Sequence, residues 1–88
     1  MKIVRKGQAG TMQSSDLMVM VEPADELTIE IESTVKKQFE HLIRAKLEQV
    51  LAKRGATSGR ISVSDRGALD YAIEARLEAA LQRAGGAA

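Results

Sequence analysis

The stretch LMVMV, residues 17–21, decides the fold, because it is apolar on both sides of an extended chain. Successive side chains of a β-strand point to opposite faces. One face would carry Leu17, Val19 and Val21, and the other Met18 and Met20. A strand that is apolar on both faces is typical of a sheet interior that is covered twice. We therefore expect a central strand here, covered on both sides.

The segments around this strand also have β character. Residues 9–13 are expected to form a shorter partner strand, with residues 13–16 as the hairpin tip, because Ser and Asp side chains bond nearby backbone groups. Further on, LTIEIES at 27–33 alternates strictly between apolar and polar residues. This pattern predicts a strand with one wet face. Its inward residues would be Leu27, Ile29 and Ile31, and its outward residues Thr28, Glu30 and Glu32.

Residues 34–54 have helical periodicity. Ser33 or Thr34 can cap the start of this helix. Lys53, Arg54 and Gly55 suit its end, where cations complement the dipole and Gly accepts a left-handed turn. The apolar stripe consists of Val35, Phe39, Leu42, Ile43, Leu47, Val50 and Leu51.

The last third of the chain predicts a loop, a strand and a second helix. GATSGR at 55–60 is the loop, and RISVS at 60–64 is a short strand with Ile61 and Val63 inward. A helix over about 66–84, capped by Ser64 or Asp65, follows from an Ala-rich stretch. Residues 84–88 are expected to be a frayed tail. The stripe of this helix consists of Leu69, Ala72, Ile73, Leu77, Ala80, Leu81 and Ala84.

The predicted order is therefore β-β-β-α-β-α over a single domain, residues 1–88. Two helices on one face of a small, mostly antiparallel sheet make a two-layer α+β sandwich. This arrangement conflicts with a central strand that is apolar on both faces, since one face would be open. That face is either thinly covered or in contact with another protein.

Composition restricts the function. A chain of 88 residues buries only roughly 60–65% of its unfolded surface, so a free-standing enzyme is not expected. Thirteen basic and twelve acidic residues nearly cancel, which argues against a nucleic-acid binder. No Cys is present, so no disulfide, zinc knuckle or thiol nucleophile can form. Without a signal-peptide core or a long apolar run, we expect a cytoplasmic protein with no membrane contact.

Few side chains suggest chemistry. His41, the only histidine, falls opposite the apolar stripe, which indicates a solvated surface residue and no metal site. The acidic residues between positions 22 and 32 fit a solvated strand face. Lys46 and Arg76 fall within the apolar arcs of their helices and can bury their stems while keeping the charge at the edge. The alternative is that both line a contact with a partner or a phosphate.

The remaining candidate is QSSD at 13–16, which by itself is ordinary hairpin chemistry. The functional alternative is a modification site, because a modifying enzyme can reach a hydroxyl on an exposed tip but not one within a paired strand.

Three segments resemble one family in order and spacing. They are AGTMQSSDLMVMV at 9–21, VKKQFEHLIR at 35–44 and VSDRGALDYAIEARLEAALQRA at 63–84. The chain is similar to the acyl carrier subunit, or gamma chain, of citrate lyase. This resemblance implies a non-catalytic phosphoprotein whose Ser14 carries a phosphodiester-linked 2′-(5″-phosphoribosyl)-3′-dephospho-CoA. Gly10, Thr11, Ser14 and Asp16 match the spacing of the family's motif, so the resemblance implies Ser14 and not its neighbour Ser15. Protein made without the arm-attaching enzyme would lack the group.

The resemblance also implies a mechanism and partners. The thiol of the arm would carry acetyl and citryl thioesters between a transferase (alpha) subunit and a lyase (beta) subunit, and citrate would be cleaved to oxaloacetate and acetate. The outward face of the 17–21 strand and the charged helix edges are the predicted docking surfaces. Two alternatives stay open: the acyl carrier subunit of malonate decarboxylase, and an unmodified protein-interaction domain.

Overall fold

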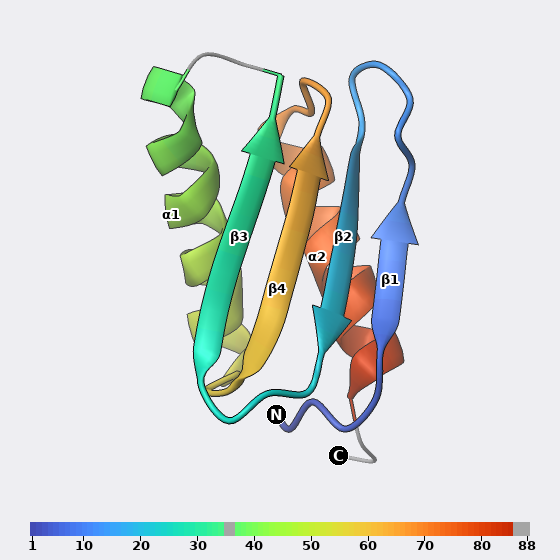
Figure 1. Ribbon diagram of the computed structural model, residues 1–88, viewed down its shortest axis with the longest axis vertical. Coiled ribbons are helices and arrows are strands. Elements are labelled where there is room, and N and C mark those ends of the chain that lie inside the picture. Colours follow the sequence, from blue (N-terminus) through green and yellow to red (C-terminus); the bar gives the residue numbers. More distant parts are fainter. Residues whose placement is uncertain (35–36, 86–88) are drawn as a thin grey trace.

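Four strands and two helices build the protein, shown as a computed structural model that describes residues 1–34 and 37–85 (Figure 1). Both helices lie on the same face of the sheet. The predicted β-β-β-α-β-α order and two-layer α+β sandwich are confirmed. The elements are β1 (Gly7–Gly10), β2 (Leu17–Glu22), β3 (Leu27–Ser33), α1 (Lys37–Arg54), β4 (Gly59–Asp65) and α2 (Asp70–Ala84).

The sheet is mixed, with the strand order β1-β2-β4-β3. β1 pairs with β2 and β2 with β4 in antiparallel fashion, whereas β3 pairs with β4 in parallel. Parallel neighbours need a long crossover, which α1 provides. β4 thus lies between two strands that follow each other in sequence. This brings the end of β4 beside the start of β2, with Leu17 opposite Asp65.

β2 is interior to the sheet but is covered on one side only. Leu17, Val19 and Val21 are fully buried under the helices, whereas Met20 on the other face is 41% exposed. The expectation of cover on both sides is wrong, because α1 and α2 lie on the same face (Figure 1). The second apolar face of β2 is therefore the open face of the molecule.

β1 is displaced from its predicted position. It occupies Gly7–Gly10, whereas residues 9–13 were expected. Its small side chains let α2 approach closely, because a Cβ at Gly7 would overlap backbone atoms of Ala80 and Ala84. The strand over 27–33 is confirmed as β3, and its carbonyl at Ile29 accepts a hydrogen bond from Arg44 of α1 at 3.3 Å.

α1 ends as predicted, with Gly55 in the left-handed region at φ 69°. Its start differs, because the structure places the first helical residue at Lys37, and Val35 lies outside the described residues. Ile43, Leu47, Val50 and Leu51 of the predicted stripe are buried. The other two described members, Phe39 and Leu42, are 45% and 55% exposed, which corrects the prediction.

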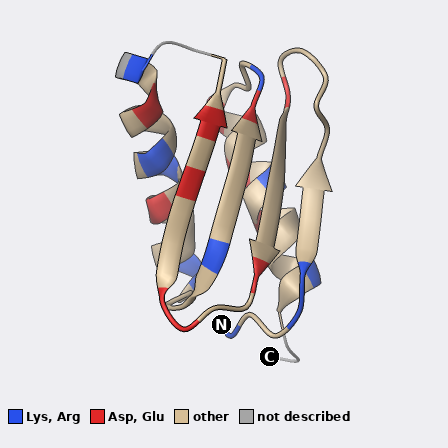
Figure 2. Cartoon of the chain, in the orientation of Figure 1, with Lys and Arg blue, Asp and Glu red and all other residues tan. Residues whose placement is uncertain are grey.

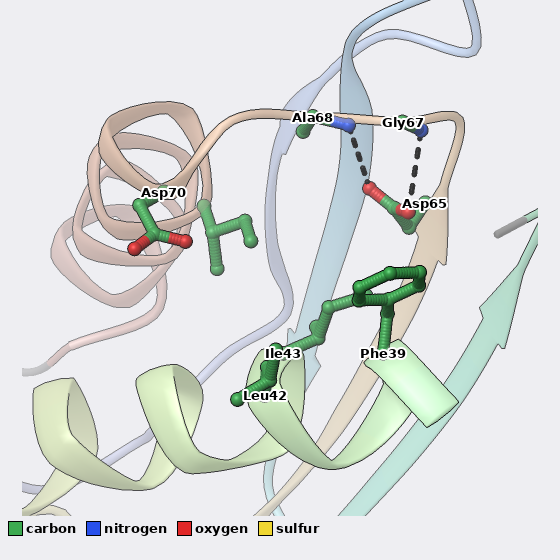
Figure 3. A pocket seen from close by; sticks show the side chains of 8 residues that line it. Phe39, Leu42, Ile43, Asp65, Gly67, Ala68 and Asp70 are labelled. Atoms are coloured by element: carbon green, nitrogen blue, oxygen red, sulfur yellow. Dashed lines mark hydrogen bonds between the residues drawn. The ribbon is translucent and has the colours of Figure 1, made fainter. Parts of the chain in front are cut away.

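α2 begins at Asp70, four residues later than predicted, because a turn occupies residues 66–69. Asp65 does not cap the helix. It lies 1% exposed at the end of β4, where its carboxylate accepts hydrogen bonds from Gly67 N and Ala68 N (Figure 3). Leu69 is consequently 61% exposed, while Ile73, Leu77, Ala80, Leu81 and Ala84 are buried as expected.

The first residues of the chain and the end of α2 lie together, at the far end of the sheet from this turn (Figure 1). Ile3 is buried and forms an isolated bridge with Gly85, and Arg5 donates to the Gly85 carbonyl at 2.6 Å. Positions 86–88 of the expected tail lie outside the described residues. Within the described chain, neither helix combines the length and apolarity needed to cross a bilayer.

Candidate functional site

The loop between β1 and β2 forms the tip of a hairpin at residues 11–16. The Asp16 N–H donates to the Gln13 carbonyl at 3.2 Å, so residues 13–16 form a tight turn, as predicted. Ser14 and Ser15 occupy its two central positions. Ser15 has φ 67°, a left-handed conformation that some turn types require at the second central residue. The two hydroxyl candidates therefore differ in backbone conformation.

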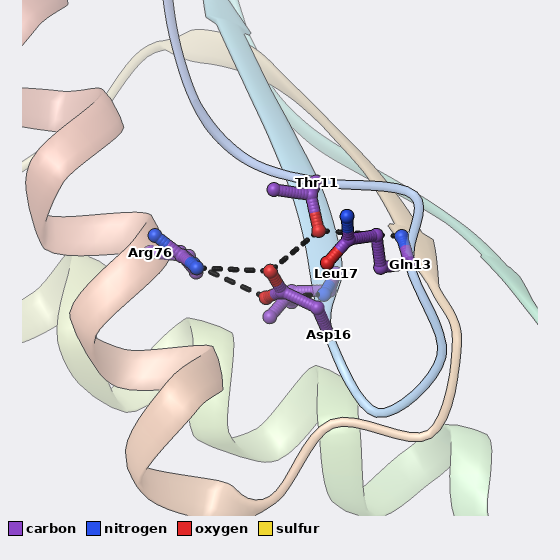
Figure 4. A network of polar contacts seen from close by, with 5 residues as sticks. All are labelled: Thr11, Gln13, Asp16, Leu17 and Arg76. Atoms are coloured by element: carbon purple, nitrogen blue, oxygen red, sulfur yellow. Dashed lines mark hydrogen bonds and ion pairs between the residues drawn. The ribbon is translucent and has the colours of Figure 1, made fainter.

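A network around the Asp16 carboxylate holds the tip in shape (Figure 4). Thr11 Oγ1 donates to one carboxylate oxygen at 2.7 Å, and the Leu17 N–H donates to the other at 2.7 Å. Arg76 of α2 binds both oxygens, with Nε at 3.1 Å and Nη2 at 2.9 Å. A bidentate guanidinium–carboxylate pair fixes orientation as well as distance. The tip is thus attached to α2.

The same contacts shift the titration of Asp16. Hydrogen bonds from Arg76, Thr11 and the Leu17 amide, in that order, stabilise the carboxylate and lower its pKa from 3.8 to about 2. Asp16 is therefore ionised at any physiological pH, and its pair with Arg76 persists there.

Gly10 and Thr11 complete the base of the tip. Gly10 has φ 103°, and a Cβ there would overlap the Leu17 carbonyl, so no other residue fits without a backbone shift. The Thr11 N–H donates to Leu17 O at 3.1 Å, and Thr11 Oγ1 accepts from Gln13 N at 3.2 Å. Both residues thus stabilise the conformation of the loop.

A second brace comes from the turn after β4. The Ser15 N–H donates to Arg66 O at 2.8 Å, and the Arg66 N–H donates to Asp16 O at 2.9 Å. These bonds continue the pairing of β2 with β4 beyond the end of the strands. The tip is therefore held on one side by α2 and on the other by the 65–69 turn.

Ser14 and Ser15 are both exposed, and neither hydroxyl has a hydrogen-bond partner among the described residues. The amide of Ser15 is bound to Arg66, whereas Ser14 stands at the corner of the turn. Gly10, Thr11 and Asp16 each stabilise the conformation of the loop. The Ser14 side chain, by contrast, makes no hydrogen bond to the described residues. The tip therefore presents the Ser14 hydroxyl to solvent on a rigid support.

Sequence reasoning missed the role of Arg76. Its position within an apolar arc suggested a buried stem and either an edge charge or a partner contact, but its guanidinium is committed to Asp16, 60 residues away in the chain. No local pattern signals a pair at that separation. Lys46 is likewise engaged within the fold, with Nζ 3.2 Å from Glu74 Oε2.

The other candidates stay at the surface. His41 is exposed, as predicted. Glu30 and Glu32 point to the open face as expected, where Glu30 pairs with Arg60 at 3.0 Å and Glu32 with Arg66 at 3.7 Å. Figure 2 shows these acidic bands along β3. In the described part of the chain, no group of three or more His, Cys, Asp or Glu side chains could hold a metal ion.

Comparison with known proteins yields one family. The family model for acyl carrier proteins described as "Malonate decarboxylase delta subunit (MdcD)" matches residues 4–84. The citrate lyase acyl carrier protein of Haemophilus influenzae is 50% identical over 84 residues, which cover 96% of this chain and 88% of that protein. The protein of the same name from Albidiferax ferrireducens is 49% identical over 88 residues, which cover 98% and 90%.

The fold has a counterpart among solved structures. A chain in the crystal structure of a Pseudomonas malonate decarboxylase hetero-tetramer in complex with malonate superimposes with a TM-score of 0.76. The match covers 97% of this chain and 93% of that chain at 22% sequence identity. At this identity the likeness concerns the fold alone.

Proposed function

The chain belongs to the acyl carrier protein family that includes the citrate lyase carriers, and on that premise we propose that Ser14 is the attachment point of its prosthetic arm. The chain is an acyl carrier subunit of citrate lyase and not itself a catalyst. The observation that carries the Ser14 proposal is its exposed, uncommitted hydroxyl on a tip braced by Asp16, Arg76 and Arg66.

Carriers of this kind bear a covalently attached arm, and we identify the arm as phosphodiester-linked 2′-(5″-phosphoribosyl)-3′-dephospho-CoA. The residues fit such a group, because the Ser14 hydroxyl is exposed and has no hydrogen-bond partner among the described residues. When attached, the arm supplies the thiol that this chain lacks, and the thiol holds the acyl group as a thioester. The chain itself supplies a rigid base.

Rigidity of the base matters because the arm has to visit separate active sites. A tethered group reaches each site at an effective concentration set by the tether, and a fixed anchor keeps that volume constant. The partners in this proposal are the transferase (alpha) and lyase (beta) subunits, together with the arm-attaching enzyme. A cytoplasmic location fits these partners.

The open face of the sheet is the proposed docking surface for those subunits. Met20 is 41% exposed there beside the partly exposed Met18, so an apolar strip runs along β2. Reversing the charge of Arg76 or Lys46 would test docking poorly, because both residues form ion pairs within the chain. Met20→Lys is the better probe, with Thr57→Lys in an exposed loop as its control. Loss of complex formation in the first variant only supports this surface, and unchanged assembly contradicts it.

Intact mass tests the attachment site. The protein is co-expressed with its arm-attaching enzymes, and the same measurement is made on Ser14→Ala and Ser15→Ala. We expect the mass of the arm on wild type and on Ser15→Ala, and no gain on Ser14→Ala. A gain lost only in Ser15→Ala would move the site by one residue. A chain that never gains mass would be an unmodified interaction domain.

The acyl group on the purified arm tests the assignment to citrate lyase. Acetyl and citryl groups are expected after incubation with citrate and the partner subunits. A malonyl group in their place would favour the malonate decarboxylase alternative.

A further inference from the structure

A pocket of about 300 Å³ opens between the first turns of α1 and α2, beneath the turn that follows β4 (Figure 3). This volume lies at the lower limit of small-molecule sites. Its walls are mostly apolar, and two carboxylates complete the lining. The lining residues are Phe39, Leu42, Ile43, Asp65, Gly67, Ala68, Asp70 and Ile73.

The pocket is adjacent to the hairpin tip. Arg66 binds Ser15 and Asp16 through its backbone, and the next two residues of the chain, Gly67 and Ala68, line the pocket. The tip and the pocket also lie at the same end of the sheet, because Leu17 at the base of the tip is opposite Asp65. Only the turn at residues 66–69 therefore separates a group attached to Ser14 from the pocket.

Part of the pocket wall is exposed apolar surface on α1. Phe39 and Leu42 are 45% and 55% exposed, although the helical periodicity places both on the buried stripe. About half of each residue is uncovered in the described structure, and the two form one wall of the opening. Covering them would bury apolar area at roughly 25 cal/mol per Å².

We infer that this pocket holds the acyl-bearing end of the arm when the acyl group is small and uncharged. The inference rests on the proposed attachment at Ser14. The tether raises the local concentration into the millimolar range, so a weak intrinsic affinity suffices for occupancy. An acyl thioester held in this pocket is shielded from water between visits to the partner subunits.

The acidic lining of the pocket should favour uncharged acyl groups over anionic ones. Asp65 and Asp70 line it, and no Lys or Arg is among the described lining residues. An acetyl group carries no charge, whereas a citryl group carries two free carboxylates. Like charges in a partly desolvated site repel each other and are costly to bury. The acetyl form is therefore held, and the citryl form is released to solvent.

Nuclear magnetic resonance on the complete, arm-bearing protein tests the inference. Intact mass first establishes that the arm is present. Acetylation of the thiol is then expected to shift the Ile73 and Leu42 methyl signals and the Phe39 ring signals, while citryl loading leaves them near their arm-free positions. With the arm present, unchanged pocket signals on acetylation would overturn the inference and leave the carrier function intact.

Hydrolysis of the acetyl thioester gives a second readout. An occupancy of about three quarters would slow hydrolysis about fourfold relative to free S-acetylpantetheine. Phe39→Ser and Leu42→Ser, both at exposed positions, should restore the free rate, whereas Leu69→Ser, also exposed but outside the lining, should not. Asp70→Asn should bring the citryl form into the pocket, with Asp25→Asn as its control. Equal rates in wild type and both pocket variants would contradict the inference.

Free S-acetylpantetheine separates this inference from the proposed function. Titrated into unmodified protein, it should shift the same Ile73 and Phe39 signals and saturate in the millimolar range. If no arm is ever attached but these shifts occur, the pocket still binds its ligand and only the attachment proposal fails. If neither this probe nor the attached arm moves the signals, the pocket has no such role.

Discussion

Asp16 and Asp65 lie at the same end of the sheet, each beside a turn, yet they have different roles; Asp65 is opposite Leu17, the next residue after Asp16. The Asp65 side chain is fully buried, and its hydrogen-bond partners are neutral: the Ser33 hydroxyl and the amides of Gly67 and Ala68. The Asp16 side chain is 17% exposed and is bound by a cation from α2. Asp65 pairs buried donors at the edge of the core, whereas Asp16 attaches the hairpin tip to α2.

The difference shows how a small domain can present an exposed hydroxyl, here the proposed attachment site, without losing stability. Asp65 accepts hydrogen bonds from polar groups that would be costly to leave unpaired in the core. Asp16 accepts the hydrogen bonds that orient the tip. Because it is partly exposed, water can replace some of these bonds when they are lost. Changes at the tip should therefore affect presentation of Ser14 more than folding.

Removing Asp65 should have the largest effect. Asp65→Ala leaves the two amides and the Ser33 hydroxyl without their acceptor, and a buried donor without a partner costs about 1–3 kcal/mol. We expect a loss of about 3 kcal/mol in the free energy of unfolding, measured by urea denaturation. Asp25→Ala, in an exposed turn, is the control and should change stability by less than about 0.5 kcal/mol. A loss no greater at Asp65 than at Asp25 would show that the 65–69 turn does not depend on this carboxylate.

Breaking the Asp16–Arg76 pair should have an intermediate effect. Asp16→Ala and Arg76→Ala should each cost about 1–2 kcal/mol, with a coupling of about 1 kcal/mol in a double-mutant cycle, because the pair is bidentate but partly exposed. Arm attachment to either variant should also slow. Strictly additive losses would mean that the ion pair does not hold the tip.

Acid should weaken the pair between Asp16 and Arg76 as the pH falls from 3.8 to about 2. Because the pKa of Asp16 is lowered to about 2 in the fold, its stabilising contribution is complete above its ordinary pKa of 3.8 and is lost as the pH falls from 3.8 to about 2. After allowance for solvent screening, this contribution is about 1 kcal/mol. The difference in unfolding free energy between wild type and Arg76→Ala should shrink over that window. A pH-independent difference would contradict the prediction.

Substituting Ser14 should have the smallest effect on the fold. Its hydroxyl has no partner among the described residues, so Ser14→Ala should change the unfolding free energy by less than about 0.5 kcal/mol. The same variant should lose arm attachment completely. A large loss of stability would show that the tip depends on this hydroxyl for its shape.

Much of the local structure could be predicted from side-chain periodicity. The alternation at 27–33 placed β3 correctly, and the buried residues of α2 followed from their helical spacing. The limits of α2 and β1 could not be predicted in this way. Asp65 fits a helix cap equally well in sequence, and only its burial at the end of β4 makes it an acceptor for the turn. β1 ends at Gly10, whose φ of 103° departs from extended backbone.

The sequence by itself determined the element types, the position of the hairpin tip and, through family resemblance, the candidate Ser14. These features depend on residues close together in the chain, where spacing reports which side of an element is buried. Only the tertiary structure decided that β4 lies between β2 and β3, that Arg76 binds Asp16, and that a pocket opens beside the tip. Each of these depends on residues far apart in the chain, and their adjacency arises only when the helices pack on one face of the sheet.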